Sequence, residues 1–308
     1  MTRIAIAGVG KIARDQHIPH ILANPDFDYV AAVTRGAIDG DGVPAFHSIP
    51  EMMAANLGVE AIAICTPPIS RMPLLADALA AKLDVLMEKP PAATLSEAEH
   101  FSVMAQEAGG LLYQSWHSRE AAAVEPAREW LKGKAIKSVR VDWLEDVRVW
   151  HPGQEWVWEP GIGVFDPGIN ALSVISRLLP RPLMVQTSEL RFPSNKPAPI
   201  AATLALTNPA GIPIAVNLDW DQKGPQTWDI SFETDGGMLK LGHGASLMWV
   251  DGTAVDVVAE PEYATMYKRF AELIKARESD IDLSPFRIVA DAFLLARRSV
   301  VGAFTEAG

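Results

Sequence analysis

Two patterns of apolar positions divide the chain. In its first third, short apolar runs alternate with stretches where apolar residues recur at helical spacing; the runs lie at residues 4–8, 29–33, 61–65, 85–87 and 111–116. Runs this short, rich in Val, Ile and Leu, are typical of strands buried on both faces of a sheet. Because helical stretches separate them, they predict a parallel, doubly wound sheet.

The pattern changes near residue 136, where strand-like runs begin to follow one another directly. They lie at residues 136–144, 182–192, 200–206, 212–220, 228–234 and 238–241. Asp235-Gly236-Gly237 predicts a hairpin turn between the last two runs. One helix, at residues 166–179, is expected to interrupt the set, and a mostly antiparallel sheet is the natural interpretation.

Two helices are predicted to close the chain. Tyr263, Tyr267 and Phe270 share one face of the first, and Ser284-Pro285 opens the second with a favourable N-cap and a proline at its first position. We expect this last helix to pack back on the first domain.

The fold class that follows is α/β with two domains. Residues 1–118 are predicted to form an N-terminal Rossmann domain with a doubly wound parallel sheet. Residues 119–308 are predicted to form a C-terminal α+β domain with an open, mostly antiparallel sheet, which carries the substrate site. A sheet with one uncovered face favours a homodimer or higher homo-oligomer through that face.

Composition narrows the classes of function. The formal net charge of −11 works against nucleic-acid binding, which rewards a basic face. No apolar run reaches the ~20 residues of a membrane span. The apolar start is too short for a signal peptide, so we expect a cytoplasmic protein. The single cysteine, Cys65, excludes an internal disulfide and a multi-cysteine metal site, and we expect no metal.

A glycine pattern marks a nucleotide site. Gly8-Val9-Gly10-Lys11-Ile12-Ala13 fits G-x-G-x-x-A where the first strand ends and a helix begins. Gly8 allows the tight turn, Gly10 lets the backbone approach a pyrophosphate, and Ala13 permits close packing of the helix. The helix N-terminus then favours phosphate, so Gly8, Gly10, Lys11 and Ile12 are predicted to contact a dinucleotide.

The second strand is followed by Thr34-Arg35, where an NAD site usually carries an acidic residue. Arg35 would pair with a 2′-phosphate through two hydrogen bonds, and Thr34 is neutral. The pair favours NADP, with NAD possible. The alternative is that Arg35 is an ordinary surface residue.

Glu88-Lys89-Pro90 follows the fourth strand, at the edge of the sheet where ligands bind. Lys89 is therefore expected near the nicotinamide. A cis bond between Lys89 and Pro90 would aim the ammonium inward. The alternative is a surface loop lysine.

Three motifs together resemble the Gfo/Idh/MocA oxidoreductases: Gly8-x-Gly10-x-x-Ala13, Thr66-Pro67-Pro68 and Glu88-Lys89-Pro90. The similarity spans the whole chain. It implies an N-terminal Rossmann domain, a C-terminal open α/β sheet, and action on sugars or cyclitols. It also implies an active-site role for Lys89 and places Thr66, Pro67 and Glu88 at the cofactor.

The family's second active-site stretch carries an Asp and, four residues later, a His at the start of a helix. Here residues 163–170 occupy that place, with Asp166 and Asn170 on one helical face. Asn170 departs from the family pattern, because Asn cannot act as a base near neutral pH. The base role therefore shifts to Asp166, and Asn170 is left to orient a hydroxyl.

A narrower resemblance is carried by residues 10–17, 116–119 and 150–154, which are similar to bacterial L-arabinose and D-galactose 1-dehydrogenases of this family. Those enzymes oxidise the anomeric carbon of a pyranose to a lactone. Tryptophans and charged residues crowd the segment between Trp143 and Trp158, as in a sugar site. The alternative for any single Trp is the core of the sheet. The candidate substrate residues are His117, Glu145, Trp150, His151 and Asn170.

His117 and His151 have no further His or Cys nearby to complete a metal site, so they are expected to bind hydroxyls. Two other functions stay open. One is a different sugar or cyclitol dehydrogenase of the family. The other is a sugar-sensing regulator without catalysis, against which the presence of both Lys89 and Asp166 argues.

Overall fold

The computed structural model describes residues 1–36 and 40–306. The chain forms two compact units: Met1–His117 with Pro261–Leu283, and Ser118–Glu260 with Ser284–Gly308. The sequence predicts one boundary after residue 118 and a last helix that returns to the first domain. In the structure the returning segment is Pro261–Leu283, which carries the helix before the last one.

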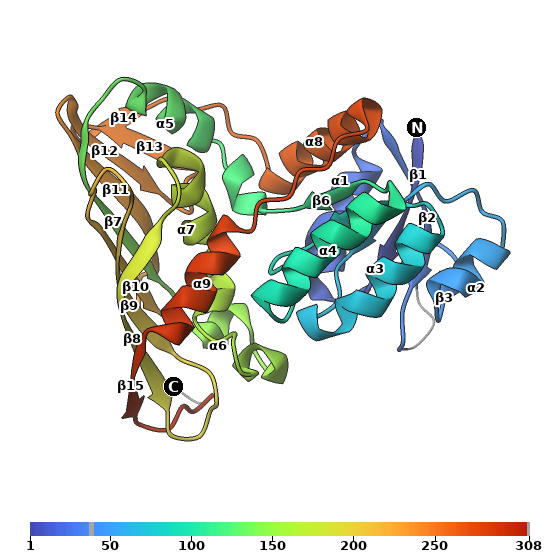
Figure 1. The fold of residues 1–308 in the computed structure, drawn as a ribbon, viewed down its shortest axis with the longest axis horizontal. Coiled ribbons are helices and arrows are strands. Elements are labelled where there is room, and N and C mark those ends of the chain that lie inside the picture. Colours follow the sequence, from blue (N-terminus) through green and yellow to red (C-terminus); the bar gives the residue numbers. More distant parts are fainter. Residues whose placement is uncertain (37–39, 307–308) are drawn as a thin grey trace. The chain divides into compact units, whose positions relative to one another are not determined.

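A parallel sheet of six strands, in the order β3-β2-β1-β4-β5-β6, forms the first unit (Figure 1). Its strands are β1 (Thr2–Ala7), β2 (Phe27–Val33), β3 (Ala45–Phe46), β4 (Ala61–Ile64), β5 (Asp84–Met87) and β6 (Leu112–Gln114). This is the Rossmann order, and it confirms the predicted doubly wound sheet. The two-residue β3 was not predicted, because two residues carry no readable pattern.

Helices connect these strands and cover the sheet. They are η1 (Ala13–His17), α1 (Ile18–Leu22), α2 (Ile49–Ala54), η2 (Pro68–Ser70), α3 (Arg71–Ala80), α4 (Leu95–Ala108) and α8 (Glu262–Ala276). The apolar face of α8 joins the core of this unit, where Phe270 stacks on Phe27 with ring centroids 5.7 Å apart. Burial of this aromatic face explains why α8 belongs to the first unit.

The second unit is built on a sheet of nine strands in the order β14-β13-β12-β11-β7-β10-β9-β8-β15. Its strands are β7 (Ile136–Leu144), β8 (Met184–Pro193), β9 (Ala201–Thr207), β10 (Ile214–Asp219), β11 (Thr227–Thr234), β12 (Gly237–Gly242), β13 (Leu247–Val250), β14 (Thr253–Val255) and β15 (Ala296–Val301). Among the described residues of this sheet, only the pairs β10–β7 and β15–β8 are parallel. The mostly antiparallel sheet is thereby confirmed.

The end of the chain differs from the prediction. It closes on strand β15, which pairs with β8 at the sheet edge, and not on a helix. Four of the six residues of β15 are exposed, so they lack the apolar alternation by which a half-buried strand is recognised. Hydrogen bonding to β8, which is distant in sequence, defines this strand.

Two helices pack together on one face of the nine-stranded sheet, as Figure 1 shows for α7 (Phe165–Leu178) and α9 (Ser284–Leu294). The remaining helices of this unit are η3 (His117–Glu120), which starts at the junction of the units, α5 (Val124–Leu131), α6 (Val147–Trp150) and η4 (Glu155–Trp158). A Cβ at Gly168 would lie 2.5 Å from Leu218 Cδ1, so glycine lets α7 approach β10 closely. This contact fixes α7, and with it Asp166.

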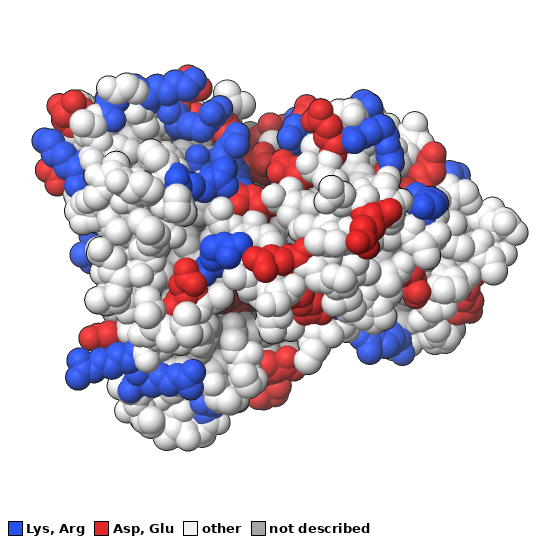
Figure 2. Space-filling model, viewed as in Figure 1, with Lys and Arg blue, Asp and Glu red and all other residues white. Residues whose placement is uncertain are grey.

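Figure 2 shows lysine and arginine side chains interspersed with aspartate and glutamate on the face in view.

Within residues 1–36 and 40–306, no helix has the length and apolar character needed to cross a membrane.

Candidate active-site groups

The glycine loop after β1 fits a dinucleotide. Gly8 has φ +94°, and an added Cβ would lie 2.7 Å from Thr66 Cγ2, so the chain itself demands glycine there. A Cβ at Gly10 would meet nothing within 4 Å, so the fold alone does not require glycine at this position. The Thr66 hydroxyl is buried and has no hydrogen-bond partner among the described residues. An open glycine in the loop after β1 and an unsatisfied buried hydroxyl after β4 each suit a phosphate-bearing ligand.

The other predicted cofactor residues lie around this loop. Lys11 forms an ion pair with Asp15, one turn further on, and its side chain is mostly exposed. The side chain of Ile12 is partly exposed. Thr34 directly follows β2, and its Oγ1 accepts a 3.3 Å hydrogen bond from the Gly36 backbone. Arg35 is exposed at the same carboxyl edge of the sheet. The side chain of Arg71 donates to the Thr66 carbonyl over 2.9 Å and so holds the loop after β4.

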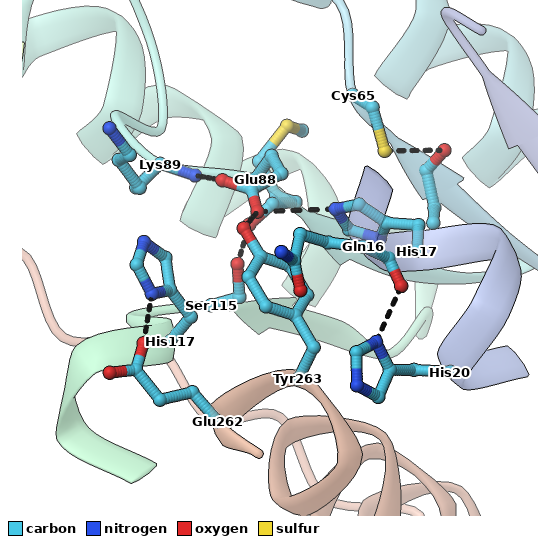
Figure 3. A network of polar contacts seen from close by, with 12 residues as sticks. Gln16, His17, His20, Cys65, Glu88, Lys89, Ser115, His117, Glu262 and Tyr263 are labelled. Atoms are coloured by element: carbon cyan, nitrogen blue, oxygen red, sulfur yellow. Dashed lines mark hydrogen bonds and ion pairs between the residues drawn. The ribbon is translucent and has the colours of Figure 1, made fainter. Parts of the chain in front are cut away.

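Glu88 is the centre of a buried polar network in the first unit (Figure 3). Its Oε1 accepts hydrogen bonds from the Tyr263 hydroxyl over 2.7 Å and from His17 Nε2 over 3.2 Å. Its Oε2 accepts one from the backbone N–H of Lys89 over 2.6 Å. The Lys89–Pro90 bond is cis, and Figure 3 shows the Lys89 side chain extending away from the carboxylate. Glu88 therefore fixes the backbone of Lys89.

Glu88 and His17 stabilise each other's charges in this buried network. Burial opposes the charge on Glu88, but His17, His117 and Lys89 outweigh it and hold the pKa of Glu88 well below its usual range. Burial also opposes a charged His17, yet Cys65 and Glu88 together raise the pKa of His17 to about 9. Burial raises the pKa of the Tyr263 hydroxyl well above its usual value, so this group remains a donor. The result is an imidazolium–carboxylate pair in the core.

His117 lies beside this network. Its Nδ1 is 2.6 Å from Glu262 Oε2, and its ring stacks on Tyr263 with centroids 5.1 Å apart. The predicted substrate residue His117 is thus positioned by α8, a contact that no local pattern predicts.

Asp166 lies in the first turn of α7, where the helix dipole favours a carboxylate. It is buried, and its Oδ2 is 3.4 Å from His151 Nε2. Asn170, one turn along the same helix, is partly exposed. The structure therefore brings together Asp166 and His151, which come from separate segments. Asp166 shares α7 with Asn170, and His151 follows α6.

Tryptophans connect the other predicted substrate residues of this unit. Glu145 is buried and accepts hydrogen bonds from Trp220 Nε1 over 3.0 Å and Trp228 Nε1 over 2.8 Å. The Trp150 ring lies edge-on to Trp228 at 5.6 Å, and the His151 ring edge-on to Trp220 at 5.4 Å. Glu145 is thus an anchor for the two indoles that border Trp150 and His151.

The alternative of a tryptophan core holds for part of the segment. Trp143 and Trp158 are buried, whereas Trp150 is 46% exposed. In the described part of the chain, no three His, Cys, Asp or Glu residues form a group that could hold a metal ion.

Sequence reasoning missed His17, Tyr263, Trp220 and Trp228 as members of these networks. A usable signal existed for Tyr263, because a tyrosine on the apolar face of a helix needs a buried partner for its hydroxyl. The partner itself could not be named, since Glu88 lies 175 positions away.

The chain is similar to known oxidoreductases. A family model described as "Oxidoreductase family, NAD-binding Rossmann fold", the Gfo/Idh/MocA family, matches residues 2–115. Galactose 1-dehydrogenase of Pseudomonas fluorescens is 44% identical over 304 residues, which cover 99% of each chain. The chain belongs to the Gfo/Idh/MocA oxidoreductase family. The predicted family resemblance is thereby confirmed.

Two solved structures share the whole fold. The crystal structure of a D-galactose-1-dehydrogenase protein from Rhizobium etli has a TM-score of 0.93 and 45% identity, and the match covers 98% of this chain and 97% of that one. A 3-ketoreductase from Actinomadura kijaniata in complex with NADP has a TM-score of 0.81 at 18% identity, over 97% of this chain and 99% of its own. The second likeness shows the fold alone.

Proposed function

We propose that this protein is an NAD(P)-dependent aldose 1-dehydrogenase, which oxidises the anomeric carbon of D-galactose or L-arabinose to the aldonolactone. The carrying observation is the full-length similarity to galactose 1-dehydrogenase, in a chain that has both Lys89 and Asp166. These two sugars share the configuration of C2 to C4 in the pyranose ring and differ by a hydroxymethyl group. One pocket accepts both unless something clashes with the added group.

Each candidate residue has a chemical task in this reaction. The bound nicotinamide supplies the hydride acceptor. Asp166 accepts the proton of the C1 hydroxyl. Lys89 donates a hydrogen bond to the C1 oxygen as negative charge develops there. Asn170, Trp150 and His117 bind and orient the sugar through hydroxyl hydrogen bonds and ring contact.

The proposed cofactor preference is NADP, with NAD accepted. Arg35 supports it, because this exposed cation follows β2 at the carboxyl edge, where the ribose of a dinucleotide is bound in Rossmann domains. Thr34 supports it as well, since it adds no negative charge that would repel a 2′-phosphate.

A homodimer through the second sheet is the proposed assembly, and the cytoplasm the proposed location. The outward residues of β7, β11 and β12 surround a hollow lined by Ser138, Arg140, Ser231, Glu233, Lys240 and Trp249, among others. Their charges are paired along the face, as between Lys240 and Asp229 at 2.8 Å. A two-fold contact through such a face would be polar, and light scattering at several salt concentrations would detect it.

The function is tested by incubating the purified protein with a panel of aldoses and cyclitols and with NAD or NADP. We expect reduced cofactor to form with D-galactose and L-arabinose, and the lactone to be trapped by hydroxylamine. Turnover of cyclitols alone would favour another dehydrogenase of the family. Calorimetric sugar binding without turnover would favour the sensing regulator. Either result would refute the proposal.

A further inference from the structure

Near the end of the chain, Phe304 and Thr305 form a short tail that is bound to the segment carrying Trp150 and His151. Phe304 is 7% exposed, and its ring centroid lies 4.8 Å from that of Trp158. The Phe304 backbone N–H donates to Asn195 Oδ1 over 2.8 Å, and its carbonyl accepts from Asn195 Nδ2 over 2.9 Å. Ring packing and these two hydrogen bonds fix the tail in place.

Arg148 connects this tail to α6. Its Nε donates a hydrogen bond to the Thr305 carbonyl over 2.9 Å, and its guanidinium carbon lies 4.5 Å from the centre of the Phe304 ring. Its Nη1 donates to Asp146 Oδ1 over 2.9 Å and to Asp221 Oδ1 over 2.8 Å. The tail therefore holds the cation that binds the two carboxylates beside α6.

The position of α6 depends on such contacts, because this helix is a single turn, Val147–Trp150. Helices shorter than about 12–15 residues are marginal in water without outside contacts. Burial contributes little here, since Val147 is buried but Val149 is 62% and Trp150 46% exposed. Side-chain contacts on either side of the turn must therefore determine where the Trp150 ring lies.

Two anchors supply those contacts. Gln226 is the first, since its Oε1 accepts from Trp150 Nε1 over 2.8 Å and from the Asp146 backbone N–H over 3.1 Å. Arg148, held by the tail, is the second. Its guanidinium and its backbone N–H both donate to Asp146 Oδ1, the oxygen that caps the turn.

We propose that Phe304 and Thr305 are positioning residues of the sugar site, which hold Arg148 and through it fix α6. This inference rests on the proposed function, which assigns Trp150 and His151 to sugar binding. The tail itself contacts neither sugar nor cofactor in this arrangement. Its loss should therefore weaken sugar binding and leave the chemical step nearly unchanged.

The kinetic test uses Phe304→Ala in the full-length protein. We expect KM for D-galactose to rise about tenfold, while kcat changes by less than about threefold and KM for the cofactor by less than about twofold. Phe304→Leu keeps most of the apolar volume and should raise KM less than Phe304→Ala does. Asn195→Ala removes both hydrogen bonds to the Phe304 backbone and should raise KM at least about threefold, so it decides the question if Phe304→Ala fails to fold.

A second measurement needs no substrate. The His151 backbone N–H donates to the Val147 carbonyl over 2.8 Å and is protected only while the turn is formed. Hydrogen exchange followed by mass spectrometry should show at least about tenfold faster exchange of residues 146–152 in Phe304→Ala than in wild type. The helix α7 of the same molecule should exchange at the wild-type rate.

Trp130→Ala is the matched control. Lys134 Nζ lies 4.2 Å from the centre of the Trp130 ring, so this variant removes the aromatic member of another cation–ring pair in the same unit. Trp130 lies on α5, at the opposite end of the nine-stranded sheet from α6 (Figure 1). Trp130→Ala should leave KM for D-galactose and the exchange of residues 146–152 at their wild-type values.

The outcomes separate this inference from the proposed function. A wild-type protein that oxidises no aldose overturns both. An active wild type whose tail variants keep a normal KM for the sugar, or lose only kcat, overturns the positioning role alone. Unchanged exchange of residues 146–152 in Phe304→Ala, or equally faster exchange in Trp130→Ala, also overturns it.

Discussion

The hydroxyl of Tyr263 on α8 donates a 2.7 Å hydrogen bond to Glu88 Oε1, and the two residues are 175 positions apart. The other oxygen of Glu88 accepts from the backbone of Lys89. One buried carboxylate thus connects α8 to the residue that we place at the reacting oxygen.

Replacing this donor should weaken the first unit. Tyr263→Phe leaves a buried charge without one partner, and we expect a loss of about 1.5–3 kcal/mol in the free energy of unfolding. Tyr29→Phe is the matched control, since the Tyr29 hydroxyl donates to the neutral carbonyl of Gly40 over 2.9 Å. Its loss should be about 0.5–1.5 kcal/mol. Urea denaturation measures both, and equal losses would contradict the assigned charge of Glu88.

The pKa of His17 predicts a pH dependence of stability. Because folding raises this pKa from 6.5 to about 9, the protonated form is stabilised in the native state. The contribution is complete below pH 6.5 and is lost as the pH rises through 9. The stability advantage of wild type over His17→Gln should therefore shrink by roughly 3 kcal/mol across this range. Denaturation curves at several pH values measure it, and parallel pH dependences of the two proteins would refute the prediction.

Two glycines of one loop should respond differently to the same substitution. Gly8→Ala meets Thr66 at 2.7 Å and strains a backbone of φ +94°, so both stability and cofactor binding should fall. Gly10→Ala meets nothing within 4 Å and should keep its melting temperature within about 2 °C while losing dinucleotide affinity. Thermal melts and fluorescence titration with reduced cofactor separate the two effects. Unchanged cofactor affinity in Gly10→Ala would place the pyrophosphate elsewhere.

Arg35 should decide between the two dinucleotides. Arg35→Ala should weaken NADP binding by roughly ten- to a hundredfold, because a charge-assisted pair contributes about 1.5–3 kcal/mol. NAD has no 2′-phosphate, so its dissociation constant should barely change. Titration with both cofactors measures this, and equal weakening of the two would rule out Arg35 as the discriminating residue.

Lys89 and Asp166 should both affect turnover. Asp166→Asn keeps the shape of the side chain and removes the base, and kcat should fall by about 10²–10⁴. Lys89→Met removes the donor to the developing oxyanion and should also lower kcat. The double variant should lose less than the product of the single losses, because the two groups act on one transition state. Near-normal turnover of Asp166→Asn on every aldose tried would move the base to another residue.

Periodicity in the sequence was enough to predict most of the fold. Strands β1, β2 and β4 are dense in Ile, Val and Ala, and this composition can be recognised without any structure. Strands β13, β14 and β15 were not predicted, because they are short or mostly exposed and are defined by pairing with strands already in place. Such pairing depends on tertiary position, which local pattern does not encode.

Candidate site residues could be predicted where a motif or a resemblance marked them, as for Gly8, Lys89 and Asp166. The residues that contact them could not be predicted. His17 meets Glu88 across 71 positions and Tyr267 across 250, and such contacts appear only when the core is assembled. The anchoring role of Glu145 was likewise not predicted, since the indoles of Trp220 and Trp228 come from the end of β10 and from β11, the strands on either side of β7, which are distant from Glu145 in sequence.

The return of Pro261–Leu283 to the first unit has a consequence for synthesis on the ribosome. The first 117 residues emerge early, but the aromatic face of α8 that completes their core emerges only after most of the second unit has been made. Until then Phe27 lacks a stacking partner and Glu88 lacks the Tyr263 hydroxyl. The nucleotide-binding unit is therefore synthesised first but can complete its folding only late. During that interval its incomplete apolar core must be protected from aggregation.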